Sequence, residues 1–310
     1  MKIAILGVGS LGTYFGGLLS LQGADVSLII RNKAHLEAIK NNGLTLRIDG
    51  VDTLVQVKSF APSETKNIGF MDLIFIFTKT NASEDALEDA KNLIGKETRL
   101  ISLQNGLGNE KILSKFAPLE HIIYGITTTP ADLLAPALVS SSGSFSSCEF
   151  KSVKENKKTK ELAQALVKFL NKAGIKSSIN ENINKAIWTK LAFNCAINTT
   201  CSLLDGTPGF VFKDERLKQL ILSIALETCF VAKKALGIEI EKSTIEKMIE
   251  QSNKYHKNHK PSMVNDINNK HLSEIDSLNG AVIQVAKKHN IPTPLNETIY
   301  ALIKGLEAKF

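Results

Sequence analysis

The sequence predicts an α/β protein with a doubly wound parallel sheet in its first part and an all-helical second part. Through the first half of the 310 residues, strand-like and helix-like segments alternate, which is typical of parallel sheets covered by helices on both faces. Beyond Asn180, long helical periodicities replace the strand signals. Because the chain is also longer than one hydrophobic core usually organises, we expect two domains, residues 1–180 and 181–310.

The first βαβ unit is the most informative segment. An apolar strand at residues 2–6 precedes an amphipathic helix at 13–22, and a second strand follows at 25–30. A glycine-rich loop joins the first strand to the helix and consists of Gly7, Val8, Gly9, Ser10, Leu11 and Gly12. These segments follow one another at the lengths expected of a Rossmann-type dinucleotide site.

Each glycine of this loop has its own physical role. Gly7 permits a sharp turn, Gly9 lets the backbone approach a pyrophosphate, and Gly12 lets the helix lie close to the sheet. The unpaired N–H groups at the helix N-terminus bind an anion without any basic side chain. A purely structural βαβ unit is the alternative, but the complete fingerprint favours a bound dinucleotide.

The end of the second strand indicates which dinucleotide binds. Sites for NAD usually place a carboxylate about 20 residues after the glycines, where it accepts a hydrogen bond from the ribose 2′-hydroxyl. This chain has Arg31, Asn32 and Lys33 there instead. A guanidinium suits a phosphate dianion because it donates two parallel hydrogen bonds. We therefore predict NADPH rather than NADH, and the alternative is a solvated loop with ordinary surface charges.

The remaining segments of the first half complete the expected sheet. Asp49-Gly50 lies between two strand-like runs, residues 44–48 and 51–57, and predicts a hairpin. The other expected elements are strands at 72–79, 99–106 and 176–179, shorter strands within 122–150, and helices at 82–93 and 157–173. Parallel strands place ligands at their carboxyl ends, so the cofactor crevice should receive the side chains of Lys79, Thr80, Gln104 and Asn105.

A second group of polar residues lies in the helical half. Lys190, Asn194 and Asn198 are four residues apart, so they form one polar stripe on a helix that is otherwise mostly apolar. If this helix lies in the interior, the lysine is poorly solvated and requires a partner. A stripe that faces solvent is the alternative, and the spacing alone leaves both open.

Composition limits the function classes. The formal net charge is +7, but the lysines are scattered, and their densest cluster, residues 151–160, also carries glutamates. We therefore expect no nucleic-acid site. The chain has no run of 18 apolar residues, so we expect no membrane span. Its four cysteines form no C-x-x-C pair, which favours reduced thiols and a cytoplasmic protein.

Three histidines of the helical half, His256, His259 and His271, could be read as metal ligands. No cysteine or acidic cluster completes such a site, and the surrounding residues are typical of a wet helix surface. We expect no metal.

Motifs spread over nearly the whole chain resemble the ketopantoate reductase family, in the family's order. They are residues 2–12, Phe77-Thr-Lys79, Gln104-Asn-Gly106, residues 188–198, Ser273-Glu-Ile-Asp276 and Asn279-Gly280. The resemblance implies an NADPH-binding Rossmann-type domain at residues 1–180 and a helical substrate and catalytic domain at residues 181–310. In this family NADPH reduces 2-dehydropantoate (ketopantoate) to pantoate, on the route to pantothenate and coenzyme A.

The resemblance also implies roles for individual residues. Lys190 would donate a proton to the carbonyl oxygen, a role that suits an ammonium because hydride delivery to a ketone builds negative charge there. Glu274 would hydrogen-bond the substrate, or else pair with Lys190. The other implied site residues are Asn194 and Asn198 at substrate hydroxyls, Ser262 at the carboxylate, Asn105 beside the nicotinamide and the reacting carbon, and Arg31 and Lys79 at the cofactor.

Departures from the family pattern fall near the implied substrate site. His259 and His271 stand where family members often have asparagine and a basic residue, and Thr199 replaces a usual proline. These departures leave open a paralogue that reduces another small 2-oxo acid. A non-catalytic NADPH sensor is a third reading, although a sensor would need neither Lys190 nor Glu274.

The two-domain layout carries two further expectations. We expect the site to lie between the domains and to close when cofactor and substrate are both present. The amphipathic helices of the second half could face either a core or a partner chain, so a homodimer stays open.

Overall fold

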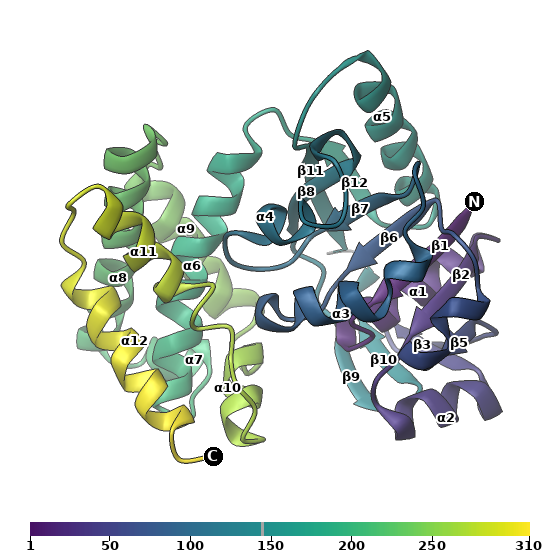
Figure 1. Ribbon diagram of the computed structural model, residues 1–310. Coiled ribbons are helices and arrows are strands. Elements are labelled where there is room, and N and C mark those ends of the chain that lie inside the picture. The colour runs from purple at the N-terminus through teal and green to yellow at the C-terminus, as the bar shows by residue number, and fades with distance from the viewer. Residues whose placement is uncertain (144–145) are drawn as a thin grey trace. The chain divides into compact units, whose positions relative to one another are not determined.

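A computed structural model describes residues 1–143 and 146–310 of the chain. Its contacts divide it into two compact units, which Figure 1 shows in their chain colours. The sheet unit consists of Met1–Gln104 and Asn109–Ile183, and the helical unit consists of Asn105–Gly108 and Asn184–Phe310. The expected class, an α/β protein with an N-terminal doubly wound sheet and a helical C-terminal part, is confirmed.

The central sheet of the sheet unit has the strand order β12-β11-β8-β7-β6-β1-β2-β5. Neighbouring strands are parallel except for β8 and β11, which are antiparallel. The strands are β1 (Lys2–Leu6), β2 (Asp25–Ile29), β5 (Lys58–Phe60), β6 (Leu73–Ile76), β7 (Arg99–Ser102), β8 (Ile122–Thr127), β11 (Ser147–Ser152) and β12 (Lys176–Ile179).

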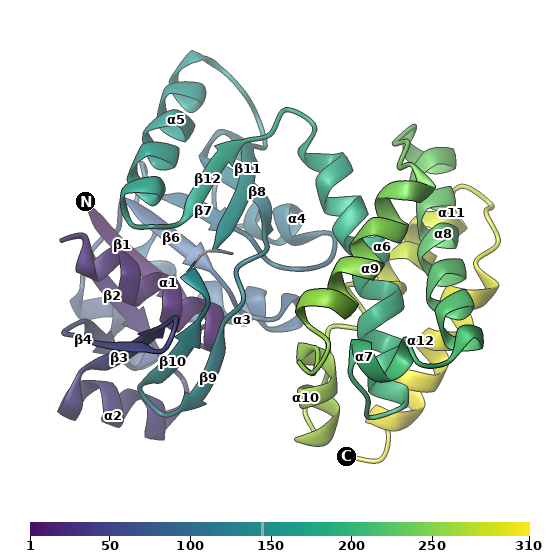
Figure 2. The same ribbon diagram turned by 180° about the vertical axis from the view of Figure 1, so that it is seen from behind.

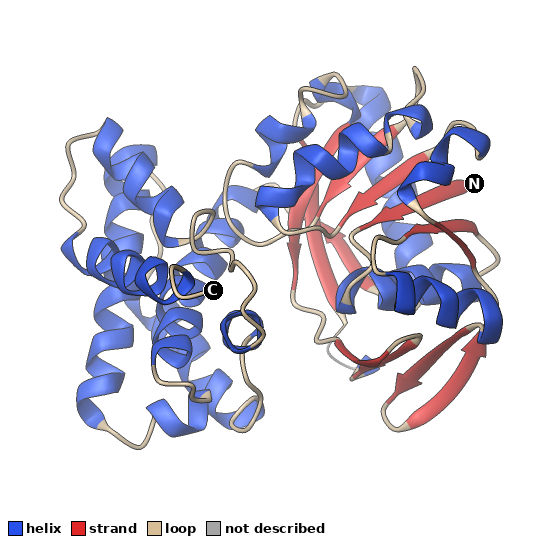
Figure 3. Cartoon of the chain, turned by 60° about the horizontal axis from the view of Figure 1, so that its bottom comes forward, coloured by secondary structure: helices blue, strands red, loops and turns tan. Residues whose placement is uncertain are grey.

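Helices cover both faces of this sheet, as Figure 3 shows. Strand β1 shows why both faces need to be covered, because it has apolar side chains on both sides. Ile3 and Ile5 belong to a core shared with α1 (Ser10–Leu21) and α5 (Lys157–Lys172). Ala4 and Leu6 alternate with them and belong to the opposite core, with α3 (Ser83–Asp89) and α4 (Asn109–Leu113).

A second, smaller sheet has the order β4-β3-β10-β9, and its strands are grouped together in Figure 2. They are β3 (Leu44–Ile48), β4 (Val51–Val55), β9 (Asp132–Ala135) and β10 (Leu138–Ser141). Helix α1 lies between the two sheets, and adjacent glycines on it face one sheet each. A Cβ on Gly16 would lie 2.4 Å from a methyl carbon of Leu28 in β2, and a Cβ on Gly17 would lie 2.6 Å from one of Leu46 in β3.

Buried His35 connects α2 (Lys33–Asn42) to α1 and to the residue before β10. It lies on α2 and is 2% exposed. Its Nδ1 accepts a hydrogen bond from the backbone N–H of Ala137 at 3.0 Å, and its Nε2 lies 3.1 Å from Oγ1 of Thr13. Since Nδ1 is an acceptor, the ring is neutral with its proton on Nε2. Burial lowers the pKa of His35, which maintains this state.

The helical unit packs around a core that includes Trp188, Leu191 and Cys195 of its first long helix. Its helices are α6 (Ile183–Leu203), α7 (Pro208–Val211), α8 (Glu215–Leu236), α9 (Lys242–Tyr255), α10 (Ser262–Asn268), α11 (Asn279–Lys288) and α12 (Pro294–Glu307). The carboxylate of Glu227 accepts hydrogen bonds from the backbone N–H groups of Leu295 and Asn296, which satisfies the start of α12. Among the described residues, no helix is long and apolar enough to cross a membrane.

Two local predictions differ from the structure in extent. The expected strand at 51–57 ends at Val55, and Lys58–Phe60 leaves the hairpin to join the main sheet as β5. The expected helix at 82–93 is α3 between two short 3₁₀ turns, η2 (Thr80–Ala82) and η3 (Lys91–Leu93). In both places long-range pairing or a turn interrupts a segment whose composition alone is uniform.

We predict that acid weakens the sheet unit through His35. The unfolded chain takes up a proton near the ordinary pKa of 6.5, whereas the folded pKa lies lower, so stability is lost as pH falls from 6.5 toward the folded value. The expected loss is at most about 1.4 kcal/mol per pH unit. Urea unfolding of the wild type and of His35→Asn, at pH 7.5 and 5.5, should show a smaller pH effect in the variant.

The control variant is His121→Asn, in the same unit at the end of η4 (Leu119–His121), where the side chain is only partly buried. It should keep the wild-type pH dependence. Equal pH dependence in His35→Asn and the wild type would contradict the assignment.

Candidate active site

The glycine-rich loop after β1 is built around two close backbone approaches. Gly7 has a φ of +84°, and a Cβ there would lie 2.2 Å from the backbone nitrogen of Thr78. A Cβ on Gly12 would lie 2.3 Å from the carbonyl oxygen of Gly7. Both positions therefore require glycine for the fold itself, because the atoms in the way belong to the backbone.

Gly9 differs, because a Cβ there would meet nothing within 4 Å. It is the N-cap residue of α1 and lines a pocket of about 340 Å³. The other lining residues come from the ends of β1, β2 and β6 and from the segments that follow them. They are Leu6, Gly7, Val8, Ile29, Ile30, Arg31, Asn32, Pro62, Phe77, Thr78, Lys79, Ala86 and Asp89.

This pocket fits the phosphates and the adenosine end of a dinucleotide. It lies at the carboxyl ends of parallel strands and beside the N-terminus of α1, where unpaired N–H groups favour an anion. The open space over Gly9 allows a pyrophosphate to approach the backbone. Among the described residues that line the pocket, Arg31 and Lys79 are the cations.

One further residue of the glycine-rich loop, Ser10, has a structural contact. Ser10 Oγ accepts a hydrogen bond from the backbone N–H of Leu133 at 3.1 Å, so its hydroxyl holds β9.

Gln104 is buried, and its Nε2 donates to the carbonyl oxygen of Thr78 and to Oγ of Ser83 at 2.8 Å. We expected Gln104 to point toward the cofactor crevice, but its side chain instead holds the connection after β6.

Arg31 and Asn32, in the segment predicted to determine the cofactor preference, make contacts within the protein. Nη2 of Arg31 lies 2.9 Å from Oδ2 of Asp89. Oδ1 of Asn32 accepts the backbone N–H of His35 and caps α2, so that side chain is committed to the helix. Lys33 is exposed on the first turn of α2. No local pattern indicates Asp89 as the partner, because it lies 58 positions beyond Arg31.

The polar stripe of the helical unit lies on α6 as predicted. Asn194 is buried, and Lys190 and Asn198 are partly buried, so the stripe does not simply face solvent. Core residues such as Leu191 occupy other sides of the same helix. The alternative of an ordinary solvent-facing stripe is thereby disfavoured.

The lysine of the stripe has a perturbed acidity. Although its side chain is not fully covered, the surrounding protein excludes enough water to lower the pKa of Lys190 to about 8. The negative charge of Glu274 acts in the opposite direction and limits the shift. The two groups therefore interact electrostatically within the helical unit, which is one of the two alternatives that the sequence left open.

Glu274 also contacts Asn105, which belongs to the helical unit although it follows β7 in sequence. Nδ2 of Asn105 donates to Oε2 of Glu274 at 3.3 Å. Next in the chain, Gly106 has a φ of +83°, and a Cβ there would lie 2.5 Å from the carbonyl oxygen of Ser277. The N–H of Leu107 donates to that same oxygen at 3.1 Å. The structure thus joins Asn105, Glu274 and Lys190, three of the predicted site residues.

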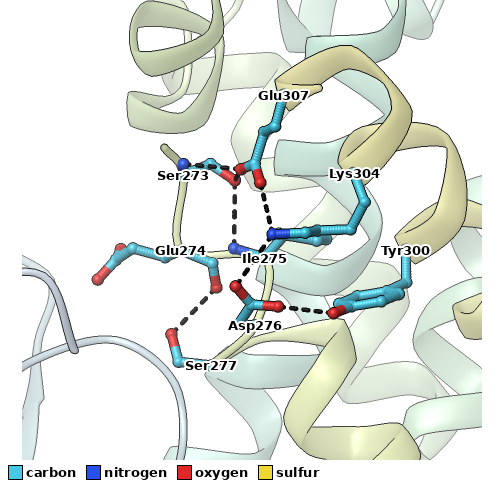
Figure 4. A network of polar contacts seen from close by, with 8 residues as sticks. All are labelled: Ser273, Glu274, Ile275, Asp276, Ser277, Tyr300, Lys304 and Glu307. Atoms are coloured by element: carbon cyan, nitrogen blue, oxygen red, sulfur yellow. Dashed lines mark hydrogen bonds and ion pairs between the residues drawn. The ribbon is translucent and has the colours of Figure 1, made fainter. Parts of the chain in front are cut away.

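Side chains of α12 hold the loop that carries Glu274 in place, as Figure 4 shows. Oε1 of buried Glu307 accepts the backbone N–H of Ser273 at 2.8 Å and its hydroxyl at 2.7 Å. Lys304 donates to Oε2 of Glu307 at 2.8 Å and also reaches Asp276. In Figure 4 the side chain of Glu274 points away from this network. The network therefore fixes the loop without using the Glu274 carboxylate.

The carboxylate at the centre of this network stays ionised. Burial by itself would raise the pKa of Glu307, but the ion pair with Lys304 and the two hydrogen bonds from Ser273 outweigh burial and lower it. Glu307 has no local signature in the sequence, because its partner Ser273 lies 34 positions away.

The remaining predicted substrate residue, Ser262, is the exposed first residue of α10. His259 and His271, the departures from the family pattern, are also exposed. The role of Ser262 stays a prediction.

Comparisons with known proteins agree along the whole chain. The profile of "Ketopantoate reductase PanE/ApbA" matches residues 3–154, and that of its C-terminal region matches residues 182–307. Proteins named 2-dehydropantoate 2-reductase from Streptococcus pyogenes serotype M6 and from Pyrococcus horikoshii are each 33% identical over 309 residues. These alignments cover 99% of this chain and 98% of each relative.

Among solved structures, that of a D-mandelate dehydrogenase with NADH and anilino(oxo)acetate is similar to this chain. It has a TM-score of 0.93 and 31% identity, and the match covers 100% of this chain and 99% of that one.

We predict that Gly9→Ala separates dinucleotide binding from folding. The new methyl group has room in the free protein, so the stability should fall by less than about 1 kcal/mol, the scale of an altered N-cap. The same methyl group would occupy the space above the loop, and the Kd for NADPH or NADH should rise at least about tenfold. Fluorescence titration of the reduced nicotinamide measures this.

Two matched variants complete the test. Gly305→Ala on α12 also has open space and should leave dinucleotide binding unchanged, whereas Gly12→Ala should destabilise the fold because of its 2.3 Å approach to the Gly7 carbonyl oxygen. Wild-type dinucleotide affinity in Gly9→Ala would contradict a pyrophosphate at this loop.

Proposed function

Because the chain belongs to the ketopantoate reductase family and is a pyridine-nucleotide-dependent oxidoreductase, we propose that it reduces 2-dehydropantoate to pantoate with NADPH. The reaction would supply pantothenate and coenzyme A synthesis in the cytoplasm. In this proposal the sheet unit, essentially residues 1–180, binds the cofactor, and the helical part, residues 181–310, binds the substrate and carries the catalytic residues.

The observation that supports this proposal most is the lysine whose pKa is lowered to about 8 beside a carboxylate. At neutral pH such a lysine is mostly protonated, yet it gives up its proton more readily than an ordinary lysine does. When bound, NADPH supplies the hydride to the 2-keto carbon. Lys190 stabilises the negative charge that develops on the keto oxygen and donates the proton that completes the hydroxyl group.

The other residues of the site would orient the substrate. Glu274 limits the loss of charge on Lys190 and accepts a hydrogen bond from Asn105, and it can also accept one from a substrate hydroxyl. Asn194 and Asn198 lie on the same stripe of α6 and would bind substrate hydroxyl groups. Ser262 would bind the carboxylate, and Asn105 would lie beside the nicotinamide and the reacting carbon.

The preference for NADPH is supported by the cations of the pocket in the sheet unit. Arg31 lies at the end of β2, where the ribose 2′ position is read in sites of this kind. Lys79 lines the same pocket and would also serve the cofactor phosphates. The glycine loop, residues 7–12, provides the backbone on which the pyrophosphate would rest.

A second candidate is a reductase of a different 2-oxo acid. The specific observation that favours it is the similarity to D-mandelate dehydrogenase, whose structure contains NADH and anilino(oxo)acetate. His259 and His271, which differ from the family pattern, are consistent with an altered substrate. A non-catalytic NADPH sensor receives less support, because Lys190 and Glu274 are both present and interact.

The first test is the rate of NADPH oxidation by the purified protein with 2-dehydropantoate, compared with phenylglyoxylate, the oxidised form of mandelate. We expect kcat/KM to be highest for 2-dehydropantoate. Lys190→Ala should lower kcat by about two to four orders of magnitude, the range for loss of a general acid. Turnover of phenylglyoxylate alone would support the second candidate, and cofactor binding without any turnover would support the sensor.

A second test uses pH. Reduction requires protonated Lys190, so kcat/KM should fall above pH 8. Glu274→Gln removes the charge that raises the lysine's pKa, and it should therefore move this decline to lower pH. Glu250→Gln, an exposed acid on α9, should not move it. A decline at the same pH in Glu274→Gln and the wild type would contradict the Lys190–Glu274 coupling.

A further inference from the structure

The cation that would receive the 2′-phosphate already has an anionic partner. Nη2 of Arg31 lies 2.9 Å from Oδ2 of Asp89, and the two side chains are 49% and 48% exposed. Both residues line the pocket that contains Gly9. Among the described lining residues, Asp89 is the acid. The ion pair is therefore part of the pocket wall and remains accessible to a ligand.

Asp89 is held at this position by the backbone around it. It is the last residue of α3, and its carbonyl oxygen accepts a hydrogen bond from Oγ1 of Thr65 at 3.1 Å. Thr65 is itself buried, within η1 (Pro62–Asn67). The carboxylate can rotate about its own side-chain bonds, but its backbone stays beside Arg31.

Lys79 also lines the pocket, but the two residues that follow Arg31 in the chain do not offset this carboxylate. The side chain of Asn32 is used to cap α2, and Lys33 is not among the lining residues. The guanidinium and the carboxylate together carry no net charge. An incoming 2′-phosphate dianion would gain hydrogen bonds from Arg31 but would be repelled by Asp89. A ribose 2′-hydroxyl experiences no such repulsion and can donate a hydrogen bond to a carboxylate.

The geometry points to Asp89 as a determinant of cofactor preference, which reduces the advantage of NADPH over NADH by occupying Arg31 and by repelling the 2′-phosphate. This inference rests on the proposed binding of the adenosine ribose beside Arg31. Under this inference NADPH stays the preferred cofactor, and Asp89 narrows the difference in affinity between NADPH and NADH.

The chain offers a matched control for an ordinary surface ion pair. Nζ of Lys91 lies 2.5 Å from Oε1 of Glu88, and both side chains are at least as exposed as those of the Arg31–Asp89 pair. Glu88 is the neighbour of Asp89 on α3 but does not line the pocket. Neutralising Glu88 therefore changes the total charge by the same amount, without touching Arg31.

The experiment measures the Kd values of NADPH and NADH for the full chain with Asp89→Asn, by titration of nicotinamide fluorescence at low and moderate salt. The ratio of the two Kd values should shift at least fivefold toward NADPH, and the shift should shrink as salt increases. Glu88→Gln should leave the ratio within twofold of the wild type. Thermal unfolding of each variant checks that the fold is intact.

Two results for Asp89→Asn would overturn the inference: an unchanged ratio of Kd values, or a ratio shifted toward NADH. The latter would mean that Asp89 positions Arg31 for the phosphate. An equal shift in Glu88→Gln would also overturn it, because the effect would then be one of total charge.

Arg31→Ala separates this inference from the proposed function. If Arg31→Ala weakens NADPH at least tenfold more than NADH while Asp89→Asn leaves the ratio unchanged, the NADPH assignment stands and the role of Asp89 fails. If Arg31→Ala weakens both cofactors equally, the 2′-phosphate assignment fails. The ratio in Asp89→Asn decides the role of the carboxylate in either case.

Discussion

The sheet unit depends on a backbone crossing that leaves no room for side chains. At this crossing the turn after β1 lies against the chain after β6, and the first turn of α1 lies against the carbonyl of Gly7. Gly16 and Gly17 extend the same constraint along α1, so that one helix can lie between two sheets. Because the helix is held so close, its N-terminus and the open loop at Gly9 face a pocket at the strand ends. The pocket proposed to bind the dinucleotide is therefore a direct product of close approach in the core.

The charged pairs of the two units differ in how much water surrounds them, and this difference fits the role proposed for each unit. Lys190 interacts with Glu274 where water is scarce, so the pair changes the proton affinity of the lysine. Arg31 and Asp89 pair where water is plentiful, and there an ion pair contributes little to stability and rearranges readily. The first arrangement suits proton transfer at a fixed place. The second is compatible with the proposed 2′-phosphate contact, for which the Arg31–Asp89 pair would have to open.

Local pattern was sufficient for much of this structure. The glycine fingerprint, the hairpin at Asp49-Gly50 and the stripe of Lys190 on α6 all depend on residues that are close in sequence. Long-range partners could not be predicted in this way. Strand β10 pairs with β3 across about 90 positions, and the partner of Arg31 is 58 positions away. Nor did the pattern indicate that Asn105 would join the helical unit, since the preceding strand predicted an ordinary exit from the sheet.

The placement of Asn105–Gly108 has a consequence for how such proteins can be recombined. The chain passes from one unit to the other after Gln104, returns at Asn109, and leaves again after Ile183. A hybrid that takes everything after Ile183 from a relative would separate Asn105 from its partner Glu274, and Gly106 from Ser277. A graft of the complete helical unit between relatives would thus also require these four residues from the first half of the chain, because the unit is not contiguous in sequence.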